Sequence, residues 1–565
     1  MTEQRQKKNT YLSASFWIAP GIFAAVFLLM SFTSRILPLG WDEGEARWRA
    51  DAIVSWVDDL NAKPLSESFS ESEIKRSWMF ISYREGHPAF YGIVCAAGEA
   101  LGRILPGCGS RTFFLLFYAA AAAGAFCKIK RITESPLNNP EENQNESGGI
   151  NLWTSCAAGI VGVLCLILIP RLFAHAHFSV NDSILTSCWL LAWVFFTLEE
   201  KPASAARAIP FGLFLGLTMA SKFTGFLAIP CFLLAGLIKR NRAMTRYLIC
   251  GLTTACVVFY LVNPPLWHDP ISGMGEFFHR NLNREESFNL TGYFFGSLYN
   301  ITYSLPWWNS ITWVLITVPV GILILVWFGL RQLWADRRRL YAPVLGANAA
   351  VLLVVRALPG APAHDNERLI ISAFAFLAII AGLGAGRALR NRAFDWFHNS
   401  DDKKIFKRFF CTELAIALIF LGSLSSWLIY APHWLSYYNL AVGGLPGAYR
   451  LGLEPTYWWT DLDEQTLRWI NDNSRRGEKV RFQACSVFNL NLLIEQKKLR
   501  VNFALQAPGK YRWYVMQTRP SLMSQSDWNR AQSQTPVYTL SIPFAGFGPW
   551  NLQSVPLIRI YKIEP

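Results

Sequence analysis

Long apolar runs recur along most of the chain, and they constrain its fold more than any other feature. Charged residues make up only 16% of the 565 residues, whereas soluble domains carry about 25%. A helix needs roughly 20 apolar residues to cross a bilayer. The sequence therefore predicts an α-helical polytopic membrane protein with about 11 transmembrane helices, near 14–36, 111–128, 151–169, 182–198, 207–221, 223–238, 247–263, 307–330, 341–357, 369–386 and 409–430.

The charge distribution sets the expected orientation. With a cytoplasmic N-terminus, the predicted inner segments hold 23 Lys and Arg, whereas the short outer turns hold four. This bias follows the positive-inside rule, and it accounts for the net charge of +14 without a nucleic-acid partner. We expect segment 87–104 to be an interfacial helix, because counting it as a span would turn the basic loops outward. The predicted cytoplasmic loops are short, which favours a bacterial inner membrane as the location.

Three regions are then expected outside. They are the loops 37–110 and 264–306 of a transmembrane domain, 1–430, and a C-terminal extracytoplasmic domain, 431–565. Within the latter, a helix is expected at 462–473. Short β-rich runs near 480–485, 501–504, 513–516, 537–542 and 557–563 predict a small α/β module.

An acidic cluster opens the first outer loop. Asp42 and Glu43 follow the first span directly. Carboxylates beside a bilayer are costly and often functional, and an ionised carboxylate suits a general base. Solvated charges at the end of a span are the alternative interpretation, and position alone favours neither.

Histidines and a third acid occur in the outer turns. His87 precedes Pro88, a pattern also typical of a helix start. His175 and His177 end the third span, and Asp182 opens the fourth. The two histidines are weak candidates for metal ligands because they do not have the i, i+4 spacing of a helical metal pair. No CxxC pair is present, so no cofactor is predicted with certainty and a divalent metal stays open.

Isolated cations mark the same face. Lys222 is a lone charge within an apolar stretch of nearly 35 residues, where a lipid phosphate would be a natural partner. Arg171, Arg368 and His268 are further candidates for phosphate binding, since Arg grips phosphate bidentately. For Arg368, ion pairs within the turn 364–368 are an equal alternative.

These motifs together resemble the GT-C superfamily of polyprenyl-phosphate-sugar glycosyltransferases, near the protein O-mannosyltransferases and the lipid A aminoarabinose transferases. Trp41-Asp42-Glu43 is similar to the acidic motif of the first outer loop, and Glu85-Gly86-His87-Pro88 to its later segment. Asp182 resembles the second acidic position, and Ser221-Lys222 the lysine between the fifth and sixth spans. The resemblance covers roughly 14–430.

The resemblance implies an inverting transfer at the outer face, from a polyprenyl-phosphate sugar to a lipid, glycan or protein acceptor. Asp42 would be the base, with Glu43 and Asp182 as further catalytic candidates, and Glu85 and His87 would join the cations in donor binding. Two positions depart from the family pattern: Ala89 replaces a second Pro, and Asp42-Glu43 is not an Asp-x-Asp. In the tail, the aromatic candidates for the acceptor side are Tyr457, Trp458 and Trp459, with an interfacial aromatic belt as an equal interpretation.

Two other functions are compatible with a polytopic chain. A transporter or flippase for a lipid-linked substrate would favour inverted repeats and polar residues near the bilayer midplane, but here no repeat is evident and the polar residues gather at the outer face. A non-catalytic scaffold would not need acids at span ends in two separate loops. The glycosyltransferase is therefore the favoured hypothesis.

Overall fold

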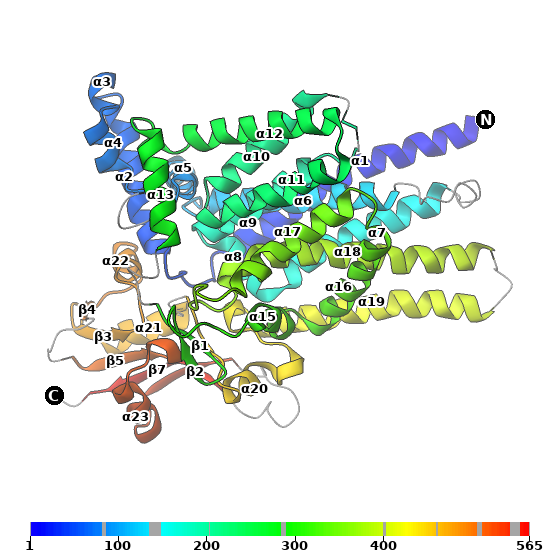
Figure 1. Ribbon diagram of the computed structural model, residues 1–565. Helices are drawn as coiled ribbons and strands as arrows, with labels where there is room; N and C mark the ends of the chain where they lie inside the picture. Colours follow the sequence, from blue (N-terminus) through cyan, green and yellow to red (C-terminus); the bar gives the residue numbers. More distant parts are fainter. Residues whose placement is uncertain are drawn as a thin grey trace.

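The structure is a computed structural model that describes residues 2–81, 86–134, 148–199, 201–202, 204–283, 290–398, 403–458, 462–504, 511–542 and 554–563. A layer of apolar helices fills one half of the molecule, and a small sheet with its own helices lies at one end of it (Figure 1). The helices of the layer are α1 (Thr2–Thr33), α6 (Thr112–Glu134), α7 (Gly148–Leu168), α8 (Pro170–His177), α9 (Asn181–Phe195), α10 (Ile209–Met219), α11 (Ala228–Lys239), α12 (Arg242–Leu261), α15 (Asn309–Thr317), α16 (Val320–Ala335), α17 (Tyr341–Arg356), α18 (Ile371–His398) and α19 (Lys403–Ile429).

Helices lie at all the predicted spans, but one span is divided into two helices and the expected count of about 11 is not confirmed. By length and composition, four helices of the described chain are able to cross a membrane, or five if the bent pair α7–α8 is one span, and five more are apolar but shorter. The predicted span 307–330 is two helices, α15 and α16. They separate at Pro319, because proline has no N–H to continue the helical ladder.

Helix α18 forms the centre of the layer. Its residues from 371 to 383 are buried almost without interruption, and it packs against α7, α16, α17 and α19. Small residues permit this close approach. At Gly329 an added Cβ would lie 1.9 Å from the Ile380 carbonyl oxygen, so the backbones of α16 and α18 are in contact there.

The loop 37–110, which is expected on the outer side, is mostly helical, with α2 (Glu43–Asp59), α3 (Leu65–Ser68), α4 (Glu71–Ser77) and α5 (Phe90–Ile104). Glu43 and Glu45 in the first turn of α2 favour a helix start, since they complement the positive end of the helix dipole. The expected interfacial helix is α5. Its 15 residues fall short of a span, and it packs on α2 and α6.

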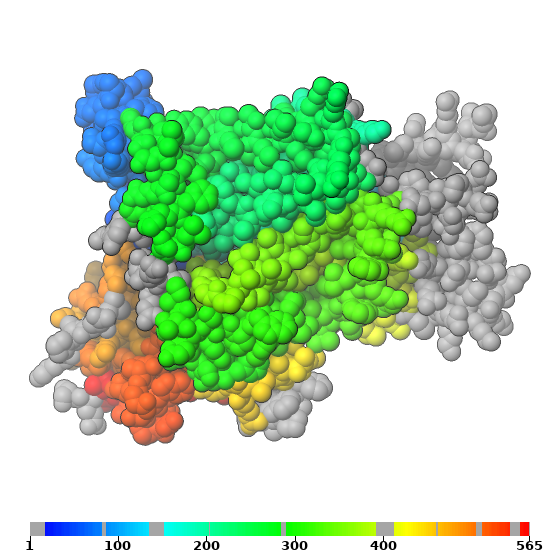
Figure 2. All heavy atoms as spheres, viewed as in Figure 1, coloured from blue at the N-terminus to red at the C-terminus, as the bar shows by residue number. Residues whose placement is uncertain are grey.

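The loop 264–306, also expected on the outer side, holds α13 (Pro270–Leu282) and the hairpin β1 (Gly292–Phe294) and β2 (Ser297–Tyr299). Figure 2 shows α13 (green) beside the tip of the first loop (blue) on one face of the molecule, above the orange and red C-terminal module. Short 3-10 helices connect the longer elements: η1 (Ala205–Ala208), η2 (Phe223–Leu227), η3 (Pro264–Leu266), η4 (Arg368–Ile370), η5 (Trp434–Ser436), η6 (Leu440–Val442) and η7 (Pro520–Leu522).

The C-terminal module is a five-stranded sheet in the order β4-β3-β5-β7-β6. β3 pairs in parallel with β4 and β5, whereas β7 is antiparallel to β5 and β6. The helix and all five strands predicted in this region are confirmed. The elements are α20 (Gly444–Arg450), α21 (Glu464–Asn473), β3 (Lys479–Gln483), α22 (Val487–Glu495), β4 (Asn502–Ala504), β5 (Trp513–Gln517), α23 (Gln525–Ser533), β6 (Tyr538–Ser541) and β7 (Pro556–Lys562).

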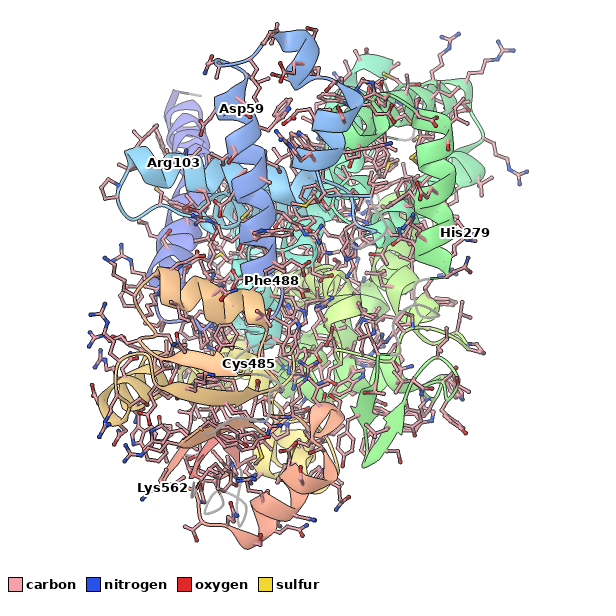
Figure 3. All side chains as sticks on the ribbon, turned by 90° about the vertical axis from the view of Figure 1, so that its left-hand side faces the viewer. Asp59, Arg103, His279, Cys485, Phe488 and Lys562 are labelled. Carbon is pink, nitrogen blue, oxygen red and sulfur yellow. The ribbon has the colours of Figure 1, made fainter. Side chains whose placement is uncertain are left out.

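Helix α22 joins the module to the loop 37–110. Asn489 accepts a hydrogen bond from the Gly44 backbone at 2.7 Å and donates one to the Gly40 carbonyl at 2.8 Å. Gly44 permits this approach, because a Cβ there would lie 2.4 Å from the backbone of Phe488. In Figure 3, Phe488 lies at the end of α2 opposite Asp59. The start of α2, which follows Asp42 directly, is thus fixed by a segment more than 400 residues away.

Candidate functional site

Asp42 lies where three distant parts of the chain meet. It directly precedes α2, and its side chain makes no capping hydrogen bond to that helix. Instead, Oδ2 accepts hydrogen bonds from Arg368 Nη1 at 3.0 Å and from the indole N–H of Trp458 at 3.1 Å. The side chain is 38% exposed, and in the described part of the chain its Oδ1 has no hydrogen-bond partner. One carboxylate oxygen is therefore held in place and the other faces open space.

Arg368 gathers two more carboxylates. Its Nε lies 3.3 Å from Asp182 Oδ2, and its Nη1 lies 3.3 Å from Asp365 Oδ2. Asp182 also pairs with Lys222 at 2.6 Å, and Asp365 pairs with Arg519 at 3.0 Å. We call these three aspartates and three cations the Asp42 cluster: Asp42, Asp182, Asp365, Lys222, Arg368 and Arg519. With all six charged, its net charge is zero.

The surroundings shift the pKa values of Asp42 and Asp365 in opposite directions. Burial raises the pKa of Asp42, and Arg368 opposes this only in part, because Asp365 adds like-charge repulsion. Burial also disfavours the charged form of Asp365, but Arg368 and other nearby cations outweigh it and lower that pKa to about 2. Asp365 is thus a fixed negative charge. Asp42 is the carboxylate better suited to take up a proton.

Trp458 holds the cluster from the C-terminal side. Its ring lies under the Arg368 guanidinium at 4.5 Å and next to the His175 ring at 5.2 Å, and its carbonyl accepts the Trp41 backbone N–H at 2.9 Å. Its backbone is left-handed, with φ of +51°, a conformation that bulky residues rarely adopt. Since only 1% of Trp458 is exposed, its ring faces are already covered and offer no platform for a sugar.

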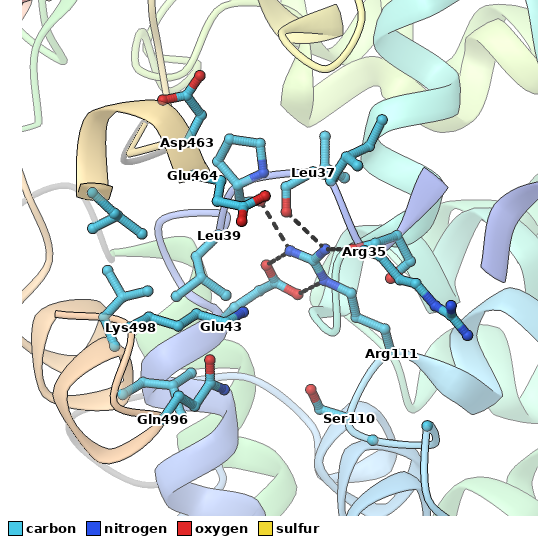
Figure 4. A pocket seen from close by; sticks show the side chains of 18 of the residues that line it. Arg35, Leu37, Leu39, Glu43, Ser110, Arg111, Asp463, Glu464, Gln496 and Lys498 are labelled. Atoms are coloured by element: carbon cyan, nitrogen blue, oxygen red, sulfur yellow. Dashed lines mark hydrogen bonds and ion pairs between the residues drawn. The ribbon is translucent and has the colours of Figure 1, made fainter. Parts of the chain in front are cut away.

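Glu43, the neighbour of Asp42, points the other way. It is 2% exposed, and its two oxygens accept hydrogen bonds from Arg111 at 2.8 and 2.5 Å. The backbone N–H groups of Ser179 and Gly40 donate two more, at 2.9 and 2.8 Å. Figure 4 shows the Glu43–Arg111 pair in the wall of a pocket. With both oxygens occupied in this way, Glu43 is suited to holding the loop rather than to proton transfer.

A second buried chain of polar groups lies behind the cluster. Arg171 pairs with Glu367 at 2.5 Å, and neither side chain is exposed. Glu367 also accepts a hydrogen bond from the Tyr457 hydroxyl, which lies 3.0 Å from His175 Nε2. Arg171 and Tyr457 are therefore engaged inside the protein, and their predicted contacts with donor phosphate and acceptor have no open surface here.

The two metal candidates, His175 and His177, form hydrogen bonds within the protein. Both ring nitrogens of His177 are occupied, Nδ1 as donor to the Phe173 carbonyl at 2.7 Å and Nε2 with the Thr33 hydroxyl at 2.8 Å. Among the described residues, no group of three or more His, Cys, Asp or Glu is arranged to hold a metal ion. Within the Asp42 cluster, the guanidinium of Arg368 occupies the centre between the carboxylates, where a cation would be held.

The remaining predicted residues are placed as follows. His268 Nε2 donates to the Phe69 carbonyl at 2.9 Å, on the first outer loop, and within the described chain it has no contact with the Asp42 cluster. The His87 carbonyl accepts a hydrogen bond from Ile81 N at 2.9 Å. Glu85 and Trp459 lie outside the described residues.

Some residues of the site were not predicted. Arg519 completes the cluster, and Arg111 and Asn489 fix the segment that carries Asp42. The contact of Asp365 with Arg368 is an ion pair within the turn 364–368, the alternative that the sequence left open for Arg368. Arg111 had a signal in the sequence, since it is a lone cation at the start of an apolar span. Arg519 and Asn489 had none, because their partners lie far away in the chain.

Comparison with solved structures finds the same fold in a protein of 14% identity. ArnT from Cupriavidus metallidurans in the apo state aligns with a TM-score of 0.51 at 14% identity, over 97% of this chain and 98% of that chain. The same protein bound to undecaprenyl phosphate aligns at 0.45, with 14% identity and the same coverage. The apo oligosaccharyltransferase from Archaeoglobus fulgidus aligns at 0.42, with 11% identity, over 89% of this chain and 70% of that chain.

At these identities the likeness concerns the fold. The resemblance to the GT-C superfamily inferred from short motifs is confirmed at that level. Comparisons of the sequence with models of protein families and with curated proteins find no match.

Proposed function

We propose that the chain is an integral membrane glycosyltransferase, which transfers a sugar from a polyprenyl-phosphate donor to a lipid, glycan or protein acceptor at the outer face of a bacterial inner membrane. One observation carries the proposal. Asp42 has one oxygen anchored by Arg368 and Trp458 and the other open, in a setting that raises its pKa. This is the arrangement that a general base requires. The GT-C fold and the order of the motifs support the donor class.

The reaction follows from the roles of these groups. Asp42 takes the proton of an acceptor hydroxyl while that oxygen attacks the anomeric carbon from the face opposite the phosphate. The bond between the anomeric carbon and the phosphate oxygen breaks, the polyprenyl phosphate leaves, and the configuration inverts. Arg368, whose Nη2 has no acceptor among the described residues, faces the phosphate, and Lys222 adds positive charge nearby. Asp182 and Asp365 orient these cations.

The test is a transfer assay on the purified protein in nanodiscs with a panel of radiolabelled polyprenyl-phosphate sugars. Wild type and Asp42→Asn are compared, each with and without EDTA. We expect wild type to consume one of the donors and the variant to be slower by about 10²–10⁴-fold, the usual contribution of a general base. Activity of the variant equal to wild type would refute Asp42 as base. A folded wild type that binds and moves a donor across the bilayer without cleaving it would favour the flippase instead. Loss of activity with EDTA would add a metal to the mechanism.

A further inference from the structure

The pocket whose wall holds the Glu43–Arg111 pair (Figure 4) is distinct from the Asp42 cluster. Its volume is about 800 Å³, within the usual range for ligand sites. Its walls come from the end of α1, the start of α6, and helices α21 and α22 of the C-terminal module. Glu43 lines it, but Asp42, Asp182 and Arg368 do not. It is therefore a separate cavity between the membrane helices and the module.

The pocket is amphipathic. Its apolar part, on the membrane helices, includes Phe27, Leu28 and Leu115. Leu28 is 66% exposed, as expected of a side chain that faces lipid tails rather than water. Its polar part, where the C-terminal module meets the loops, is strongly basic. The lining there holds seven cations and three acids: Arg35, Arg47, Arg111, Arg468, Lys497, Lys498 and Arg500, with Glu43, Asp463 and Glu464.

Three of these cations are already committed. Arg111 uses all its N–H donors on Glu43 and on the carbonyls of Ser34, Leu37 and Pro38. Arg47 pairs with Asp51 and Glu99. Arg468 pairs with Glu464. Their positive charge is balanced within the protein, so they shape the wall but leave little attraction for a ligand.

Four cations form no ion pair at contact distance in the described part of the chain, although Glu464 and Glu43 interact electrostatically with Lys498: Arg35, Lys497, Lys498 and Arg500. The lysines stand at the end of α22, where Lys498 N bonds back to the Leu493 carbonyl at 2.9 Å and closes the helix. Lys497 occupies the left-handed position of this turn, with φ of +58°, which glycine or asparagine usually fills. A lysine there bears a conformational cost, which a charge needed at this point would justify.

We propose that this pocket binds the phosphate headgroup of an anionic membrane lipid, with its acyl chains along the exposed face of α1. The lipid's phosphate would meet Lys497, Lys498 and Arg500, and its glycerol and upper chains the apolar wall. This proposal does not depend on the proposed transferase reaction. In this proposal the bound lipid contacts both α1 and the C-terminal module, because the pocket lies between them.

The test measures lipid binding to the full-length protein in detergent by native mass spectrometry, with short-chain phosphatidic acid, short-chain phosphatidylcholine or inorganic phosphate added. We expect preferential binding of phosphatidic acid, weakened roughly 30-fold by K497Q/K498Q, since each basic residue near an anionic headgroup contributes about fivefold to the affinity and the variant removes two. The control K479Q/K562Q removes two exposed lysines from strands of the same module that do not line the pocket, and it should bind as wild type does.

Lys497→Gly separates binding from folding. It removes one charge and relieves the left-handed turn, so the variant should unfold at the same or a higher temperature and still bind phosphatidic acid several-fold more weakly. Equal weakening by the control pair would show that net charge acts without a site, and would overturn the proposal. If inorganic phosphate displaces the lipid at equal concentration, the pocket is a site for a free anion and the lipid proposal is wrong. If phosphatidylcholine binds as tightly as phosphatidic acid, the net charge of the headgroup does not determine binding and the proposal is wrong.

Discussion

Arg171 forms a buried ion pair with Glu367, and we therefore expect it to stabilise the fold rather than to bind the donor phosphate. Neither side chain is exposed, and their charged atoms lie 2.5 Å apart. Arg171 also donates to the Tyr437 carbonyl at 2.8 Å and stacks on Tyr438 at 4.3 Å. Replacing Arg171 by Met leaves the carboxylate of Glu367 buried without its cation. Removing one partner of such a pair costs about 3–5 kcal/mol.

The assay is thermal and denaturant unfolding of Arg171→Met, Glu367→Gln and the double variant in one detergent. Because the double variant buries no net charge, we expect it to recover part of the loss, with a coupling energy of about 1–3 kcal/mol. The donor concentration at half-maximal rate, measured on protein that is still folded, should stay close to the wild-type value. A normal unfolding temperature together with a large rise in that concentration would refute the structural role and return Arg171 to the donor site.

Three further predictions concern the neighbours of Asp42. Glu43→Gln breaks a buried ion pair with Arg111 and should lower the free energy of unfolding by about 3–5 kcal/mol, while turnover per folded molecule, measured at low temperature, stays within a few-fold. Asn489→Ala leaves the Gly44 N–H and Gly40 carbonyl unpaired and should cost about 1–3 kcal/mol in unfolding experiments. Because burial raises the pKa of Asp42, turnover should fall as the pH drops through that raised value. Trp458→Phe removes a hydrogen bond to the ionised form, so it should move this acidic limb of the pH–rate profile to higher pH; a limb that stays in place would separate it from Asp42.

Elements defined by local pattern were predictable from the sequence. The strands β3 to β7 follow short β-rich runs, and the spans follow their apolar stretches. The helix α2 was not predicted, because its charged sequence resembles a solvated loop until α22 and α5 cover it. Likewise, Pro319 was visible in the sequence, but the apolar run on both sides of it concealed the break between α15 and α16.

The candidate site was predictable only as a set of residues. Asp42, Asp182, Lys222 and Arg368 were singled out by unusual charge near the membrane, and the structure brings all four together. Asp42 and Glu43 were not distinguishable, because adjacent acids have the same composition and depth. The turn into α2 separates them, since it directs Glu43 to Arg111 and Asp42 to Arg368. Pairings across more than 300 residues leave no local signal.

The charge balance of the Asp42 cluster leads to a last prediction. Three carboxylates already share three cations, so a donor phosphodiester adds a negative charge to a neutral cluster and competes with Asp42 for Arg368. Asp42→Asn removes that competitor. We therefore expect the variant to bind the donor about fivefold more tightly, as the loss of a competing, partly exposed ion pair of about 1 kcal/mol would give, although it turns the donor over far more slowly. Equilibrium binding of a labelled donor to the two proteins measures this, with Asp51→Asn on the exposed face of α2 as the control for charge alone. If Asp42→Asn binds the donor more weakly than wild type, Arg368 is not the cation that receives the phosphate.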